Sequence, residues 1–227
     1  MTPLDYLPFA LLGGVLGLDV VSFPQAMISR PIVAATIAGA FAGSTMAGFL
    51  IGAILELFAL GTLPFGASRY PEWGSAAVTG GALHAALPAP ADGALAAALV
   101  AALATAWASS HSMVWLRRLN AHWARERLPL LARGSGRTVI GLQLIGLTAD
   151  LVRGTVLTGI ALALFHPVTM AVAARWSGDP LPTRALIGVL AAAAAGAAVW
   201  TLFHAANHAR ALFVGGLVIG VLLVTFR

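Results

Sequence analysis

Long apolar stretches separated by short polar segments dominate the chain. Residues 94–116 and 138–165 each exceed the roughly 20 apolar residues that cross a bilayer as a helix. Shorter apolar stretches cover residues 4–21, 46–63, 185–203 and 211–226. No series of alternating ten-residue strands is visible in the sequence. The pattern therefore predicts an all-α integral membrane protein that crosses the bilayer several times.

Two apolar pieces are too short to cross a bilayer by themselves. Residues 32–42 follow a mixed segment, 22–30, and residues 76–87 follow a loop, 64–73, whose Tyr70 and Trp73 suit an interfacial position. Irregular backbone is tolerated at membrane depth only where protein or a water-filled cavity satisfies its polar groups. We therefore expect broken or re-entrant helices, as in a helical transporter.

Glycines mark places where helices pack closely. Gly39, Gly43, Gly48 and Gly52 recur in short steps, which places them along one side of a helix or of a pair of half-helices. A second group of glycines, Gly13, Gly14 and Gly17, is expected to break the first helix near its middle and to favour tight packing.

The two halves of the chain show a weak similarity in the order of their predicted elements. Pro31 precedes the short piece 32–42, and Pro167 is expected to end the long span and to precede another short piece, 168–174. Paired interrupted segments are typical of transporters built from repeats. We treat residues 1–227 as one transmembrane domain. Its parts are a first half (1–116), a basic cytoplasmic loop (117–137) and a second half (138–227).

Composition and charge agree with a membrane protein. Hydrophobic residues make up 59% of the chain and charged residues 9%, with a mean hydropathy of +0.91. Roughly a quarter of an ordinary soluble domain is charged. The N-terminus carries Asp5 and no basic region, which predicts a retained first helix and not a cleaved signal peptide.

All 13 basic residues are arginines, and six of them lie between residues 117 and 137. Short arginine-rich loops stay in the cytoplasm, so topology explains this cluster better than nucleic-acid binding does. The chain has no cysteine, which excludes disulfides, thiolate metal sites and a phosphocysteine.

Glu56 is the strongest candidate for chemistry, because a carboxylate inside an apolar span must be paired, protonated or exposed to a polar cavity. Its alternatives are a structural pair with Arg30 or Arg153 and a ligand role; we favour the ligand role, and the two can coexist. Asp19 and Gln25 lie at the junction of the first helix and the broken segment, where bent backbone suits hydroxyl-rich ligands. Asp19 could equally cap the next helical piece.

Other polar groups favour structural roles. Asp150 and Arg153 are three residues apart and are expected to neutralise each other on one helix face. His204 and His208 have metal-ligand spacing but no third partner nearby, so we expect no metal. Most of the six tryptophans fall near predicted span ends and favour an aromatic belt over sugar stacking.

Soluble-enzyme motifs are missing: the sequence has no Walker A motif, no GxSxG and no HExxH. Ser109 and Ser110 beside His111 are the only suggestive cluster, and neighbours on one helix point in different directions. We expect no cofactor and no catalysis by this chain alone.

The strings SFPQAMISRPIVAATIAGAFAG and GFLIGAILELFALGTLPFGASRYP resemble the membrane component IIC of the mannose/fructose/sorbose family of the bacterial phosphoenolpyruvate-dependent sugar phosphotransferase system. The family pattern has an acidic residue and a glutamine before Arg-Pro, a glycine ladder, Gly-x-x-x-Glu-x-x-x-x-Gly, then Gly-Ala and a proline. The corresponding residues are Asp19, Gln25, Arg30-Pro31, Gly39, Gly43, Gly52, Glu56, Gly61, Gly66-Ala67 and Pro71.

The resemblance implies a multi-pass component in the bacterial inner membrane that binds a hexose-type sugar and moves it inward by an elevator-like shift. It implies assembly with membrane component IID into an oligomer in the lipid bilayer, and phosphate supplied by soluble IIA and IIB, which carry the phosphohistidines. Asp19, Gln25 and Glu56 would contact the sugar, Arg30 would support the broken helix, and Arg153 would help line the site.

A second hypothesis is a membrane sugar sensor or regulator that does not transport. The family commonly has aspartate where Ser44 follows Gly43, and this chain is shorter than many members. Genes for IID, IIA and IIB beside this one would favour transport.

Overall fold

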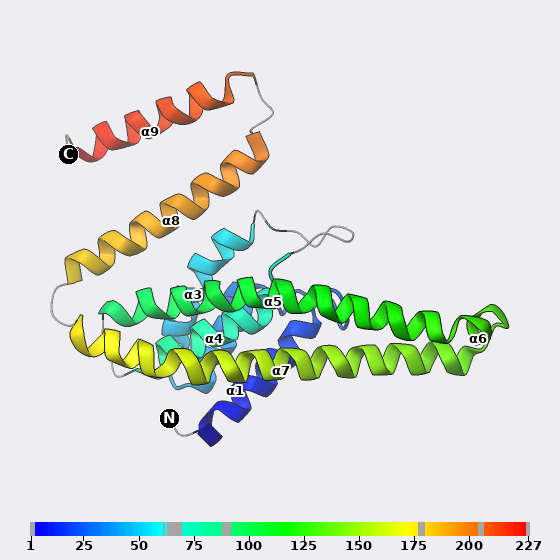
Figure 1. Ribbon diagram of the computed structural model, residues 1–227. Coiled ribbons are helices and arrows are strands. Elements are labelled where there is room, and N and C mark those ends of the chain that lie inside the picture. The colour runs from blue at the N-terminus through cyan, green and yellow to red at the C-terminus, as the bar shows by residue number, and fades with distance from the viewer. Residues whose placement is uncertain are drawn as a thin grey trace.

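The computed structural model describes residues 3–60, 62, 70–87, 92–176, 180–203 and 207–225. These residues form helices joined by turns and contain no strand, which confirms the predicted all-α class. A short 3-10 helix, Pro3–Tyr6, precedes the α-helices (Figure 1). The α-helices are α1 (Leu7–Leu18), α2 (Pro31–Phe41), α3 (Thr45–Ala59), α4 (Trp73–Ala85), α5 (Asp92–Glu126), α6 (Leu128–Ala132), α7 (Gly136–Arg175), α8 (Pro180–Phe203) and α9 (Ala209–Thr225).

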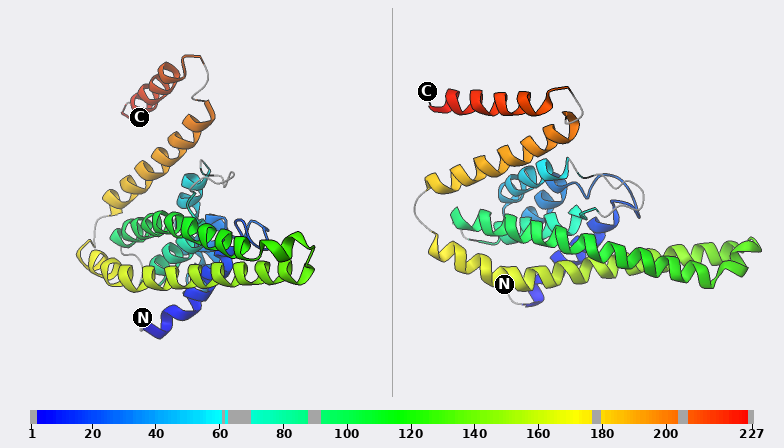
Figure 2. Two further views of the ribbon diagram at one scale, coloured as in Figure 1. Left: turned by 45° about the vertical axis from the view of Figure 1, so that its right-hand side comes forward. Right: turned by 45° about the horizontal axis from the view of Figure 1, so that its top comes forward.

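Helices α5 and α7 form a long antiparallel pair whose joined ends extend beyond the other helices (Figures 1 and 2). Among the described residues, these two helices are long and apolar enough to cross a membrane. Residues 117–137 were expected to be a loop, and this expectation is wrong. Helix α5 continues to Glu126, α6 forms the tip, and Gly134, at φ +72°, makes the turn into α7.

Helix α4 lies at the centre of the molecule and contacts α1, α2, α3, α5 and α7. Every residue from Glu72 to Leu83 is buried. Its small side chains explain this position, because a helix that is apolar all round can be surrounded by other helices only if their backbones fit closely. At Gly81, for example, an added Cβ would lie 2.5 Å from the carbonyl oxygen of Ala35.

Helices α2 and α3 form a hairpin around the predicted glycine seam. Gly39 of α2 faces Gly48 of α3, and Gly43, at φ +97°, makes the turn between them. Ser44 caps α3 by accepting a hydrogen bond from the backbone N–H of Ala47 at 3.4 Å. The seam therefore belongs to a pair of half-helices, as expected.

The expectation that residues 46–63 span the bilayer as one helix is wrong. Helix α3 has 15 residues and ends at Ala59, and α2 has 11 residues. Each is shorter than the roughly 20 residues that a crossing needs, so the hairpin has the dimensions of a re-entrant element. Gly61, Gly66-Ala67 and most of the loop 64–73 lie outside the described residues.

Two predicted helix breaks do not occur. Helix α1 runs unbroken through Gly13 and Gly14, which instead bring α1 against α7: a Cβ on Gly13 would lie 2.2 Å from the Thr158 hydroxyl. Helix α7 also continues through Pro167 to Arg175. The predicted similarity between the two halves is therefore wrong, because no short piece follows Pro167 in the second half. A proline removes one backbone hydrogen bond, and the packing of α7 against α1, α4 and α5 outweighs that loss.

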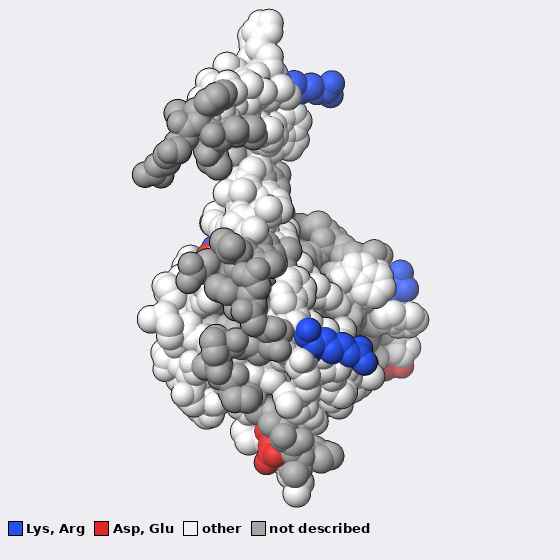
Figure 3. All heavy atoms as spheres, turned by 90° about the vertical axis from the view of Figure 1, so that its left-hand side faces the viewer, with Lys and Arg blue, Asp and Glu red and all other residues white. Residues whose placement is uncertain are grey.

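The segments predicted as the last two spans form α8 and α9. Helix α8 packs against α3 and α5. On the face shown in Figure 3, charged side chains are sparse among the described residues, which is the surface expected against lipid. How often the chain crosses the bilayer stays a prediction.

The hairpin seam can be tested at Gly48. We expect Gly48→Ala to destabilise the protein by about 1–3 kcal/mol, because the new Cβ would lie 2.2 Å from the carbonyl oxygen of Ala35. Gly141→Ala on α7 is the matched control, since a Cβ there has nothing within 4 Å. The measurement is the thermal unfolding midpoint in detergent, and equal midpoints for the two variants would refute the seam.

Candidate functional site

The loop between α1 and α2, residues 19–30, is organised by Asp19. One carboxylate oxygen accepts a hydrogen bond from the backbone N–H of Ala26 at 2.6 Å. The other accepts from the N–H and from the hydroxyl of Ser29, both at 2.9 Å. The side chain is only 2% exposed. Asp19 therefore holds the shape of the loop but does not cap α2, which has no side-chain cap. Its role toward a ligand stays a prediction.

Gln25 occupies a strained position on this loop. Its φ of 59° lies in the left-handed region, which side chains other than glycine seldom adopt. Its side-chain nitrogen donates to the carbonyl oxygen of Val21 at 2.9 Å. Non-glycine residues in sparsely populated backbone regions cluster at ligand sites, where the surrounding structure holds them. Here the loop around Gln25 is held by the hydrogen bonds that Asp19, before it, accepts from Ala26 and Ser29, after it.

Arg30 and Glu56 form an ion pair that joins the start of α2 to α3. The Arg30 Nε lies 2.6 Å from Glu56 Oε1, and Nη2 bonds to the same oxygen. Glu56 Oε2 accepts from the backbone N–H of Ile32 at 3.2 Å, at the positive end of the α2 dipole. The side chains are 32% and 18% exposed. Glu56 is therefore paired with Arg30 and not with Arg153, and the pair remains accessible.

A cavity of about 400 Å³ lies between this loop, the start of α2, the end of α3 and the start of α4. Its volume falls in the range of ligand pockets. Three predicted site residues, Asp19, Gln25 and Arg30, line it, and Glu56 lies behind Arg30. The other polar or aromatic lining residues are Ser29, Thr62 and Trp73.

Trp73 does not face the surface of the protein as a residue of an aromatic belt would, and its position relative to the membrane interface stays a prediction. It is 8% exposed, its indole N–H donates to the Thr62 hydroxyl at 2.8 Å, and it lines the cavity. Tyr70 is also buried and packs under the guanidinium of Arg117. The reason is local: the segment turns inward because Glu72 begins α4 inside the core.

Glu72 is a buried acid in the segment that was expected to be a loop. It is 0% exposed, and its Oε1 caps α4 by accepting from the backbone N–H of Ser75 at 2.9 Å. Its own N–H donates to the Ser109 hydroxyl at 2.9 Å. Glutamate is not among the residues that usually begin helices as N-caps, so no local signal in the sequence indicated this role.

Asp150 and Arg153 form the expected pair, at a distance from the cavity. Arg153 reaches Asp150 Oδ1 with Nε at 2.9 Å and Nη2 at 2.8 Å, and its Nη2 lies 3.7 Å from Glu72 Oε2. Asp150 Oδ2 accepts from the Ser22 hydroxyl at 2.7 Å, and Arg153 also donates to Ser112 at 2.9 Å. We call Glu72, Asp150 and Arg153 the buried ion cluster. Neither Asp150 nor Arg153 lines the cavity.

The suggestive serine–histidine cluster is explained by helix packing. Ser110 Oγ lies 3.3 Å from His111 Nδ1, and both side chains also bond to the carbonyl oxygen of Trp107. Among the described residues, no group of three histidine or acidic side chains could hold a metal ion. The predicted pair His204 and His208 cannot be placed, because His204 lies outside those residues.

Comparison with known families gives one match. The family described as the PTS system sorbose-specific IIC component matches residues 7–177. The match runs from α1 to the end of α7, so it contains the lining of the cavity and the whole buried ion cluster. No curated protein matches the chain.

Removing the cation of the buried ion cluster should be costly. We expect Arg153→Met to destabilise the protein by about 3–5 kcal/mol, because it leaves Asp150 and Glu72 buried without their counter-charge. Arg133→Met, on the exposed turn after α6, is the control and should change stability by less than about 0.5 kcal/mol. Unfolding in detergent measures both variants. Similar stabilities would show that the cluster is not held together by its charges.

Proposed function

The chain belongs to the family of sorbose-specific IIC components, and from this premise we propose that it binds a hexose-type sugar in the cavity beside loop 19–30 and carries it inward. As a family member it is a membrane component of a sugar permease of the phosphotransferase system. The observation that supports a binding role is the cavity itself, which brings Asp19, Gln25 and Arg30 together from two sides of a break between helices.

The chemistry of the cavity suits a sugar. A hydroxyl group donates one hydrogen bond and accepts others, so its site needs both kinds of partner. Gln25 offers an amide oxygen and an amide N–H, and Arg30 offers donors. Glu56 does not line the cavity and holds Arg30 from behind, and we propose that it reaches the sugar when that pair opens. Trp73 adds an aromatic surface at the cavity wall, which suits the C–H face of a pyranose.

We propose that the α2–α3 hairpin moves with the sugar against the α5–α7 pair. The hairpin carries Arg30 and Glu56 on its own two helices, so the ion pair would move as a unit. Its glycine seam joins α2 to α3, while α5 and α7 pack on each other. This division agrees with an elevator-like shift of a core against a scaffold.

The remaining parts of the proposal follow from the family. The chain would work in the bacterial inner membrane with component IID, as an oligomer, and soluble IIA and IIB would supply the phosphate. The sugar would be phosphorylated on IIB, so this chain is not catalytic alone. The arginines between residues 117 and 137 support a cytoplasmic position for the tip formed by α6, where soluble partners act.

A sugar sensor is the second candidate, and it rests on Ser44. In the structure Ser44 caps α3, a task that serine and aspartate perform about equally well. Ser44 also lies outside the lining of the cavity. The replacement therefore leaves both the hairpin and the proposed site intact, which favours transport.

The decisive experiment measures uptake and phosphorylation of labelled hexoses and amino sugars by membranes that contain this chain, with and without IID, IIA and IIB. We expect phosphorylated product only with the full set. Glu56→Gln and Gln25→Ala should each weaken sugar binding about tenfold or more, because the first removes the charge that holds Arg30 at the cavity and the second removes a polar partner of the sugar. Thr148→Ala, on the exposed face of α7, is the control.

Two outcomes would contradict parts of this proposal. If both variants bind sugar as the unaltered protein does, the site lies elsewhere. If sugar binds but is never phosphorylated with every partner present, the sensor is the better explanation.

The orientation can be tested with a single cysteine. Because the chain has no cysteine and Ala132 is exposed at the end of α6, Ala132→Cys creates one accessible thiol. We expect a membrane-impermeant maleimide to label it only after the cells are permeabilised. Labelling in intact cells would place the tip outside and reverse the proposed orientation.

A further inference from the structure

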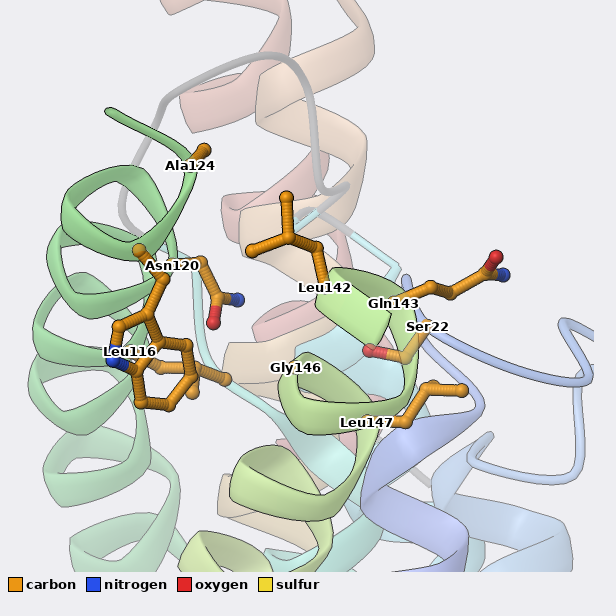
Figure 4. Close-up of a pocket in the computed structure, with 9 residues that line it drawn as sticks. Ser22, Leu116, Asn120, Ala124, Leu142, Gln143, Gly146 and Leu147 are labelled. Atoms are coloured by element: carbon orange, nitrogen blue, oxygen red, sulfur yellow. The ribbon is translucent and has the colours of Figure 1, made fainter. Parts of the chain in front are cut away.

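A second cavity, of about 350 Å³, lies between α5 and α7 near the basic end of the pair. Its polar and aromatic lining consists of Ser22, Asn120, Trp123 and Gln143. Figure 4 shows Asn120 extending from α5 toward α7, with Ser22 and Gln143 lying close together beside α7. None of the residues that bound this cavity belongs to the first one.

Asn120 indicates that this cavity is made for a ligand. Its side-chain Oδ1 is buried, and among the described residues it has no hydrogen-bond partner. Leaving a buried acceptor unpaired costs about 1–3 kcal/mol, so such an atom in a folded protein calls for a partner. Gly146 faces it across the cavity, and a Cβ there would come within 3.6 Å of the Asn120 amide. This is ordinary van der Waals contact, so Gly146 lets α7 approach Asn120 closely. Because Oδ1 has almost no exposed surface, the Asn120 amide must rotate for this atom to meet a ligand in the cavity.

The lining selects a neutral, hydroxyl-rich molecule. Serine, asparagine and glutamine offer both donors and acceptors, and the indole of Trp123 offers an aromatic surface. Among the residues that the structure describes, no charged side chain lines the cavity. A phosphorylated sugar would lack a counter-charge here, whereas a free sugar could give the Asn120 oxygen the hydroxyl donor that it lacks.

Loop 19–30 connects the two cavities. It contributes Asp19 and Gln25 to the first cavity and Ser22 to the second, and the Ser22 hydroxyl also donates to Asp150 of the buried ion cluster. The second cavity adjoins Arg117 and Arg118, which precede Asn120 on α5 and mark the predicted cytoplasmic end of the spans.

We propose that the cavity around Asn120 is a second sugar site, which holds the unphosphorylated sugar on the cytoplasmic side before it is phosphorylated. This inference rests on the proposed function, because it takes the sugar as the transported ligand. It adds a site whose residues come from α5, α7 and loop 19–30, outside the α2–α3 hairpin.

The test is equilibrium binding of labelled mannose, fructose and sorbose to the purified full-length chain in lipid nanodiscs. We expect two sites per chain for at least one of these sugars. Asn120→Leu should remove the amide that binds the sugar and halve the binding capacity, and Gln25→Ala should remove the other site. Trp115→Phe, on an exposed position of α5 outside the cavity, should leave the capacity unchanged.

Intrinsic fluorescence provides an independent readout that does not depend on the folding of the Asn120 variant. Sugar at the second site should change the emission of Trp123, and Trp123→Phe should remove that component while Trp115→Phe retains it. One outcome would overturn the second site and leave the proposed function standing. In it, the chain has a single site that Gln25→Ala abolishes, Asn120→Leu leaves the binding capacity unchanged, and sugar does not change the emission of Trp123. No binding of any of the three sugars would overturn both.

Discussion

One buried guanidinium joins the parts of the molecule that surround the first cavity. Arg153 on α7 contacts Asp150 on its own helix, approaches Glu72 at the start of α4, and donates to Ser112 on α5. A charge in an apolar interior is stable only with partners, so these elements are constrained to meet at one point. Through Ser22, Asp150 extends the same constraint to loop 19–30. The cavity beside that loop therefore depends on a cluster that does not line it.

The α2–α3 hairpin is held by different means. Its helices approach through Gly39 and Gly48, and its one strong polar contact is the pair of Arg30 with Glu56. Backbone contact across glycines contributes dispersion and close packing but no charge that must be neutralised outside the hairpin. The ion pair of the hairpin thus lies between its own two helices, while the buried ion cluster joins α7 to the start of α4. The proposed motion of the hairpin would also have to carry α4 with it, because Gly81 of α4 packs against the backbone of Ala35 on α2.

The sequence sufficed for the class of fold, the glycine seam and three residues of the first cavity, because costly polar groups in apolar surroundings are conspicuous. It failed where packing overrides local preference. Pro167 does not end α7, since three neighbouring helices support that helix along its length. Trp73 and Glu72 looked like loop residues, and their burial depends on α4 lying at the centre, which no local pattern reveals. The position of Gly146 opposite Asn120 likewise depends on how α5 and α7 pack together.

Loop 19–30 explains why both proposed sites could respond to one ligand. Asp19 fixes the loop through its bonds to Ala26 and Ser29, so the loop behaves as a small rigid body and not as a flexible connection. Gln25 lies on the side of the α2–α3 hairpin, and Ser22 lies on the side of α7 and Asp150. A shift of the hairpin that displaces Gln25 must then either move Ser22 or break bonds to a buried carboxylate. Breaking those bonds would cost more, so we propose that such a shift of the hairpin would also displace Ser22 at the second cavity.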